Sequence, residues 1–193
     1  MDKYLLVSSP MRTGSTLLYN FFRTFPGDFI VKKYHISPMK PQSCDYFVTL
    51  RRHPVASISS YLHMMDHEYT EKNIRESFDK TKKEFDWIEE LDQSGRAYPI
   101  RYEDFYNNHF YIRDFADKHF QIYVNDNQVY DFSSEYSWYN VMLKSKKEGE
   151  HMFQKNHISK HLGRNELHIE QLRSTGIMYN ELKELSERFG YEY

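Results

Sequence analysis

The amino-acid sequence predicts an α/β fold, a three-layer sandwich in which helices cover both faces of a mainly parallel central sheet. Short runs of β-type residues alternate along the chain with longer stretches whose apolar residues have helical spacing. No internal repeat or low-complexity stretch interrupts this alternation. The length of 193 residues is typical of one domain with a sizeable core, so we expect a single domain over residues 1–193.

The expected elements follow from this pattern. Runs of β-branched, aromatic and aliphatic residues predict strands at residues 3–8, 28–32, 45–50 and 97–101. Helical spacing predicts helices at residues 15–25, 54–66, 71–93, 109–120, 135–147 and 166–189. Gly176 is expected to break or kink the last helix, whose apolar stripe is typical of a face packed on the core. Segment 121–134 is polar and rich in turn residues, and we interpret it as a connection.

Composition excludes several classes of function. The formal net charge is −2, so nothing favours the wrapping of nucleic acid, and any anion site must be a local cluster. Cys44 is the only cysteine, which excludes an intrachain disulfide, and no spacing of ligand residues indicates a metal. No apolar run of about 18 residues predicts a membrane span, and the N-terminus has no signal-peptide pattern. We therefore expect a cytoplasmic protein.

The segment from Ser8 to Leu18 lies between the first predicted strand and the first predicted helix. Its sequence, Ser-Ser-Pro-Met-Arg-Thr-Gly-Ser-Thr-Leu-Leu, is rich in small and hydroxyl-bearing residues. A strand–loop–helix of this kind directs backbone N–H groups and a positive helix end at one point, where a phosphate can bind. Arg12 adds a permanent charge, and Ser15 and Thr16 add hydroxyl donors. The alternative is a tight turn whose Ser and Thr only cap the helix.

A second anion site is predicted at the end of the third predicted strand. Arg51 and Arg52 stand at its carboxyl end, and Pro54 is typical of the first turn of a helix. If a helix begins near Pro54, the Ser60 hydroxyl can face the same ligand as Arg52. Arg51 and Ser59 are separated by the same number of residues as Arg52 and Ser60. The register of this motif, that is, which of the two pairs binds the anion, therefore stays open. If this segment is taken alone, its residues are more simply explained as surface arginines and as serines on a solvated helix face.

Together these motifs resemble those of the sulfotransferases that use 3′-phosphoadenosine 5′-phosphosulfate (PAPS). The first loop, Arg-Thr-Gly-Ser-Thr-Leu, resembles the 5′-phosphosulfate loop of that family. The second segment, Arg-x-Pro followed by Ser-Tyr-x-His, resembles its 3′-phosphate motif, and the Pro and His of the motif favour the register of Arg52 and Ser60. The resemblance implies a P-loop-like sulfotransferase fold and a donor site that includes Arg12, Thr13, Gly14, Ser15, Thr16, Arg52 and Ser60.

A candidate general base lies between the two motifs. Lys33-x-His35 is similar to the Lys-Thr-His of cytosolic sulfotransferases, in which the histidine is the general base. A hydroxyl acceptor is a poor nucleophile until its proton is removed, and the pKa of histidine suits that task. The resemblance implies that His35 is the base and that Arg12, with Lys33, neutralises charge on the departing phosphate oxygen. His53 and His63 are weaker alternatives, and most lone histidines are structural or solvated.

Two further segments resemble the family. Residues 98–105 have the sequence Tyr-Pro-Ile-Arg-Tyr-Glu-Asp-Phe. They are similar to the family's strand-ending Tyr-Glu-Asp-Leu element, in which the tyrosine lies near the adenine. The matching tyrosine here is Tyr102. A helix cap formed by the acidic pair explains those residues equally well. Residues 158–165 are similar to the family's basic loop that closes over the 3′-phosphate of the nucleotide. This similarity implies that Lys160 and Arg164 contact that phosphate. A solvated basic loop is the alternative.

The sequence therefore predicts a sulfotransferase that takes the sulfuryl group from PAPS, releases 3′,5′-ADP and requires no metal. The predicted acceptor is a small molecule or a glycan. A P-loop kinase of small molecules is one alternative, although the loop lacks the Gly-x-x-x-x-Gly-Lys-Ser/Thr of such enzymes. A nucleotide-binding module without activity is the other. Neither the identity of the acceptor nor the oligomeric state follows from the sequence.

Overall fold

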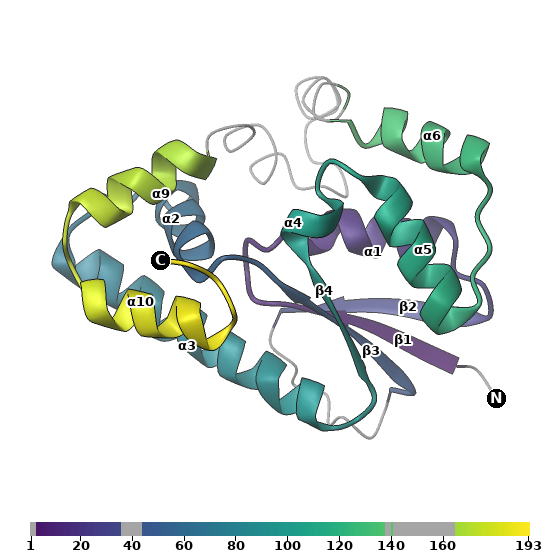
Figure 1. The fold of residues 1–193 in the computed structure, drawn as a ribbon, viewed down its shortest axis with the longest axis horizontal. Helices are drawn as coiled ribbons and strands as arrows, with labels where there is room; N and C mark the ends of the chain where they lie inside the picture. The colour runs from purple at the N-terminus through teal and green to yellow at the C-terminus, as the bar shows by residue number, and fades with distance from the viewer. Residues whose placement is uncertain (1–2, 36–43, 138–139, 141–164) are drawn as a thin grey trace. The chain divides into compact units, whose positions relative to one another are not determined.

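The computed structural model describes residues 3–35, 44–137, 140 and 165–193 (Figure 1). The chain divides into two compact units, which are described separately here. The first contains the residues up to Arg51 together with Glu84–Asn140. The second contains Arg52–Lys83 together with the described residues from 165 onward.

The first unit is built on a four-stranded sheet with the order β2-β1-β3-β4 (Figure 1). All neighbouring strands are parallel. The strands are β1 (Lys3–Ser8), β2 (Phe29–Tyr34), β3 (Tyr46–Arg51) and β4 (Ala97–Arg101). The four predicted strands are confirmed, and β2 continues past its predicted end to include Lys33 and Tyr34.

Helices cover both faces of this sheet, because successive strand residues point to opposite sides. Leu5 and Val7 face a core shared with α1, α4, α5 and α6, whereas Leu6 packs against Ile88 and Leu91 of α3 on the other face. The helices are α1 (Ser15–Thr24), α3 (Glu71–Gln93), α4 (Tyr102–Phe105), α5 (His109–Phe120) and α6 (Asp126–Glu135). The predicted α/β sandwich with a parallel sheet is therefore confirmed.

The interpretation of residues 121–134 as a connection is wrong for most of that segment. Helix α6 begins at Asp126, and Asn125 forms a capping box with Gln128, in which each side chain accepts a hydrogen bond from the backbone of the other. Val129 and Phe132 then pack into the core. The polar residues that suggest a turn are thus a helix start and the exposed face of the same helix. The helix predicted at 135–147 lies mostly outside the described residues.

The second unit is helical. It contains the first part of α3 together with α2 (Pro54–Met64), α9 (Asn165–Ser174) and α10 (Tyr179–Arg188). Helix α2 packs against both α9 and α10, and Leu172, Leu182 and Leu185 are buried as the predicted apolar stripe requires. The predicted helix over 166–189 is interrupted at Gly176, which has a φ of +66° and follows the end of α9.

Candidate functional site

The loop after β1 lies where this sheet topology favours a ligand. β1 sits between β2 and β3, so the connections that follow β1 and β3 diverge to opposite sides of the sheet. In open parallel sheets such a switch point opens a crevice at the carboxyl ends of the strands. The register aligns Ser8, the last residue of β1, with Tyr34 and Thr49. Residues 9–14 therefore leave the sheet at this switch point.

The loop backbone is held in an unusual conformation. Arg12 has a φ of +66° and Gly14 a φ of +83°, both in the left-handed region. A residue other than glycine is rarely held there, and such strain is concentrated at functional sites. Two hydrogen bonds anchor the loop from opposite sides. The Thr13 hydroxyl donates to the Pro10 carbonyl at 2.7 Å, and the Met11 N–H donates to the buried carboxylate of Glu84 at 2.6 Å.

Helix α1 begins at Ser15 without a side-chain cap. Its N-cap residue is Gly14, which has no side chain to accept a hydrogen bond, and its first turn contains no acidic residue. The Leu17 N–H donates to the Gly14 carbonyl at 3.0 Å, whereas the N–H groups of Ser15 and Thr16 have no helical carbonyl four residues before them and carry the positive end of the helix dipole. The alternative in which Ser and Thr only cap this helix is therefore wrong. The helix N-terminus is suited to an anion.

Two cationic side chains lie close together beside this helix end. Burial, and then the charge of Arg12, lower the pKa of the Lys33 ammonium from 10.5 to about 8. Lys33 Nζ donates a hydrogen bond to Thr16 Oγ1 at 2.8 Å, which leaves the Thr16 hydroxyl proton available to another acceptor. A bound anion would relieve the repulsion between the two cations, so electrostatics favour a strongly acidic ligand here.

Tyr102 lies directly against the loop. A Cβ atom added to Gly14 would overlap the Tyr102 ring carbons, so the ring contacts the glycine backbone itself. The ring of Tyr106 lies 4.8 Å from that of Tyr102, between centroids. Because Tyr102 follows β4 directly, the structure brings the end of the edge strand to the loop after β1.

His35 follows the last residue of β2 and reaches the same loop. Its Nδ1 atom lies 3.4 Å from the hydroxyl of Ser9, a long hydrogen-bond distance. Ser9 is fully buried, and its N–H donates to the Tyr34 carbonyl at 3.3 Å. The first unit thus gathers the candidate residues Arg12, Thr13, Gly14, Ser15, Thr16, Lys33, His35 and Tyr102 at the carboxyl edge of its sheet.

The arginines at the end of β3 differ in their contacts. The Arg51 guanidinium pairs with Asp92 of α3, which also accepts a hydrogen bond from Thr49. Ser59 hydrogen-bonds the Tyr69 hydroxyl at 3.0 Å. Both residues of the alternative register therefore have structural partners.

Arg52 and Ser60 lie in the second unit, where both are buried. Pro54 is the first residue of α2, as predicted. His53 uses both ring nitrogens in structural contacts, with the Val55 N–H and the Glu192 carbonyl. Lys160 and Arg164 lie outside the described residues.

Comparison with known proteins identifies the fold. No protein-family model and no curated protein matches the sequence. Among solved structures, the crystal structure of mouse sulfotransferase SULT7A1 complexed with PAP superposes with a TM-score of 0.64 at 14% identity. The match covers 97% of this chain and 90% of that one. The chain has the sulfotransferase fold.

Sequence reasoning missed two acidic residues that support the loop after β1 and the end of β3. Glu84 and Asp92 belong to α3, a helix with many charged residues, and nothing in their local sequence separates them from solvated neighbours. Glu84 meets Met11, and Asp92 meets Arg51, only because α3 packs under the sheet. The sequence separations of these pairs are 73 and 41 residues, so local patterns carry no signal for them.

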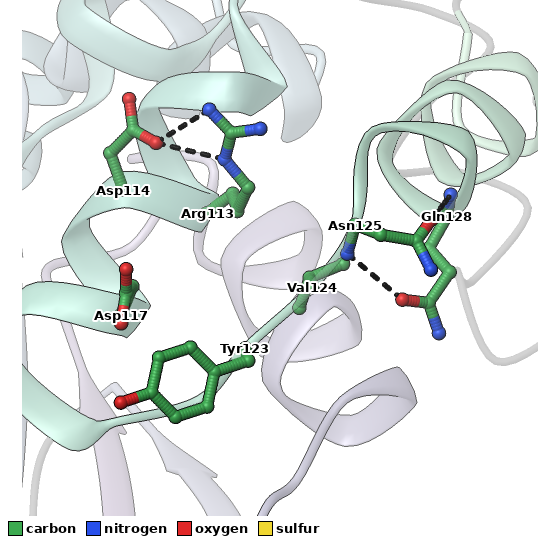
Figure 2. A pocket seen from close by; sticks show the side chains of 7 residues that line it. All are labelled: Arg113, Asp114, Asp117, Tyr123, Val124, Asn125 and Gln128. Atoms are coloured by element: carbon green, nitrogen blue, oxygen red, sulfur yellow. Dashed lines mark hydrogen bonds and ion pairs between the residues drawn. The ribbon is translucent and has the colours of Figure 1, made fainter.

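A second hollow in the first unit has no residue in common with this site. It measures about 520 Å³ and lies between α5 and the start of α6 (Figure 2). Four of its lining residues interact in pairs: Arg113 with Asp114, and Asn125 with Gln128 (Figure 2). Within the described ranges, no cluster of three or more His, Cys, Asp or Glu could hold a metal ion, and no helix has the length and apolarity to cross a membrane.

The contact between Gly14 and Tyr102 predicts a loss of folding stability when a methyl group is added at position 14. Gly95 is a matched control, because it also has a positive φ but has nothing within 4 Å of an added Cβ atom. Gly95→Ala should cost about 1–2 kcal/mol of stability through backbone strain alone. Gly14→Ala should cost about 1–3 kcal/mol more, because the methyl group also overlaps the Tyr102 ring. Urea unfolding measures both, and equal costs would contradict the contact.

Proposed function

We propose that this protein is a PAPS-dependent sulfotransferase. The observation that carries the proposal is the uncapped N-terminus of α1 beside the two cations Arg12 and Lys33, on a chain with the sulfotransferase fold. Such a site suits a ligand with several negative charges, such as a 5′-phosphosulfate. PAP, which is present in the SULT7A1 structure, is 3′,5′-ADP, the product that PAPS leaves after transfer. The acceptor class is a small molecule or a glycan, and cytoplasmic location stays a prediction.

In this proposal the donor is held at its two phosphate ends. The backbone N–H groups of residues 13–16, with Arg12 and the hydroxyls of Ser15 and Thr16, bind the 5′-phosphosulfate. Tyr102, which contacts the loop, supports the nucleoside next to that group. Arg52 and Ser60 bind the 3′-phosphate, which distinguishes PAPS from ATP. Lys160 and Arg164 are proposed as further ligands of the 3′-phosphate, on the family resemblance alone.

The contacts of Arg51 and Ser59 support this register. Arg51 is committed to Asp92, and Ser59 to Tyr69. Removing a guanidinium from a half-buried ion pair in order to bind a ligand would leave Asp92 without its counter-charge, which is costly.

The chemistry then depends on alignment and charge stabilisation. With the proton of the neutral His35 ring on Nδ1, which faces Ser9, Nε2 is the basic nitrogen and takes the proton of the acceptor hydroxyl. The acceptor oxygen bonds to sulfur as the bond between sulfur and the 5′-phosphate oxygen breaks. That oxygen keeps the electron pair and leaves as part of 3′,5′-ADP, and Arg12 and Lys33 stabilise its charge.

The transfer reaction is tested with PAPS and a panel of phenol, sugar and lipid alcohols. His35→Ala should lower the rate of 3′,5′-ADP release about 10²-fold or more, because general-base catalysis is lost, with donor affinity unchanged within about twofold. His63→Ala is the matched control and should retain the rate. If His63→Ala lowered the rate and His35→Ala did not, the general base would be a residue other than His35. Donor binding without transfer to any acceptor would favour a nucleotide-binding module without activity.

The register of the 3′-phosphate motif is tested by two ligands that differ only in that phosphate, 3′,5′-ADP and 5′-AMP. Arg52→Ala should weaken binding of 3′,5′-ADP about ten- to a hundredfold, because a charged hydrogen-bond donor to the phosphate is lost, and should leave 5′-AMP affinity unchanged. Ser60→Ala should show a smaller loss of the same kind. Ser59→Ala should leave the ratio of the two affinities as it is. A changed ratio in Ser59→Ala but not in Ser60→Ala would contradict this register.

The lowered pKa of Lys33 predicts how donor binding depends on pH. Below about pH 8 the Lys33 ammonium is charged in both the free and the bound protein, so it adds no pH dependence to the affinity for the donor. A bound anion raises the Lys33 pKa, so above about pH 8 binding requires proton uptake and the affinity for 3′,5′-ADP should fall, by up to about tenfold per pH unit. Titrations between about pH 7 and 9.5 should show this fall. Lys33→Arg stays charged over that range, and a fall of the same size in that variant would contradict the assignment.

A further inference from the structure

The last three residues of the sequence pack against the start of α2, within the second unit. The Glu192 carbonyl lies 2.8 Å from Nε2 of His53, and the Tyr191 ring lies 5.3 Å from the His53 ring, between centroids. Tyr191 is 9% exposed, and its N–H donates to the Ser186 carbonyl of α10 at 3.0 Å. The segment Tyr191–Tyr193 is thus attached to the body of the unit on the side where α2 begins.

Tyr193 fixes the other end of this segment. Its ring lies 5.0 Å from the Arg173 guanidinium of α9 and 5.0 Å from the ring of Tyr179 at the start of α10. Two helices therefore hold the segment Tyr191–Tyr193, and the segment in turn holds His53.

The contacts of His53 define one protonation state. Nδ1 accepts a hydrogen bond from the Val55 N–H at 3.2 Å and so caps α2. The proton of the neutral ring must then be on Nε2, which donates it to the Glu192 carbonyl. The Arg173 guanidinium lies 3.4 Å from the same nitrogen. His53 therefore links the helix start to the segment Tyr191–Tyr193.

His53 stands directly between Arg52 and Pro54 in the sequence, and Arg52 is 6% exposed. Pro54 fixes the backbone on one side of His53, and the two hydrogen bonds fix its ring. The backbone of Arg52 is consequently restrained by its neighbour. An arginine loses much side-chain freedom when it binds a ligand, and a preorganised residue loses less.

We propose that His53 is a positioning residue for recognition of the 3′-phosphate, and that it acts by linking Arg52 to the segment Tyr191–Tyr193. This inference rests on the proposed function, because it takes Arg52 to bind the 3′-phosphate of the donor. It adds a residue that does not touch the ligand, and it gives the end of the sequence a role in choosing between nucleotides.

The test compares 3′,5′-ADP and 5′-AMP binding in three variants by calorimetry. His53→Ala should weaken 3′,5′-ADP binding about three- to tenfold, the loss expected when one long side chain is no longer preorganised, with 5′-AMP binding within about twofold of the parent chain. His53→Asn keeps an oxygen that can cap α2 but has no second ring nitrogen for the Glu192 carbonyl. It should show the same selective loss as His53→Ala.

Parent-like selectivity in His53→Asn would overturn the proposal, because capping alone would then explain the role of His53. An equal loss of both nucleotides in both His53 variants would also overturn it, since that result indicates a general effect on folding. Arg52→Ala is the reference in the same experiment. If Arg52→Ala shows no selective loss, the proposed 3′-phosphate site fails. If it does and the His53 variants do not, only the present inference fails.

Discussion

Lys33 and Arg12 place two positive charges next to each other, at the point where the uncapped N-terminus of α1 already carries a positive dipole. Burial of the Lys33 ammonium, and after it the charge of Arg12, cost free energy, which appears as the lowered pKa of Lys33. Folding tolerates that cost because the packing of β2 beside β1 and the strained loop over Glu84 hold the groups in place. An anion of high charge relieves it.

The fold supplies the geometry for this arrangement. Four parallel strands end at one edge, and the strand order directs the connections after β1 and β3 to opposite sides. The residues with proposed chemical roles follow directly from strand ends: Arg12 after β1, Lys33 and His35 at the end of β2, Arg52 after β3 and Tyr102 after β4. The supporting groups, Glu84 and Asp92, come from α3 beneath the sheet. Ligand contacts and structural supports thus lie on different layers of the molecule.

The strands and the tight turn before α1 could be predicted because their signals are local. Runs of β-branched, aromatic and aliphatic residues identify the strands, and Gly14 among small residues identifies the turn. Helix α6 was missed because Asn125 and Gln128 act as a capping box, whereas their polarity suggests a turn. The uncapped state of α1 and the contact of Tyr102 with Gly14 depend on three-dimensional packing. So do the partners of Arg51 and Ser59.

We propose that the loop after β1 binds a 3′-phosphorylated adenosine nucleotide and not a nucleoside triphosphate. The most direct measurement is the thermal stabilisation of the intact protein by 3′,5′-ADP, compared with stabilisation by ATP and magnesium at equal concentrations. A ligand at a hundred times its dissociation constant adds about 2.7 kcal/mol to the stability of the folded state. The account predicts a clear rise in Tm with 3′,5′-ADP and little change with ATP and magnesium. Equal or greater stabilisation by ATP and magnesium would contradict it and favour a kinase.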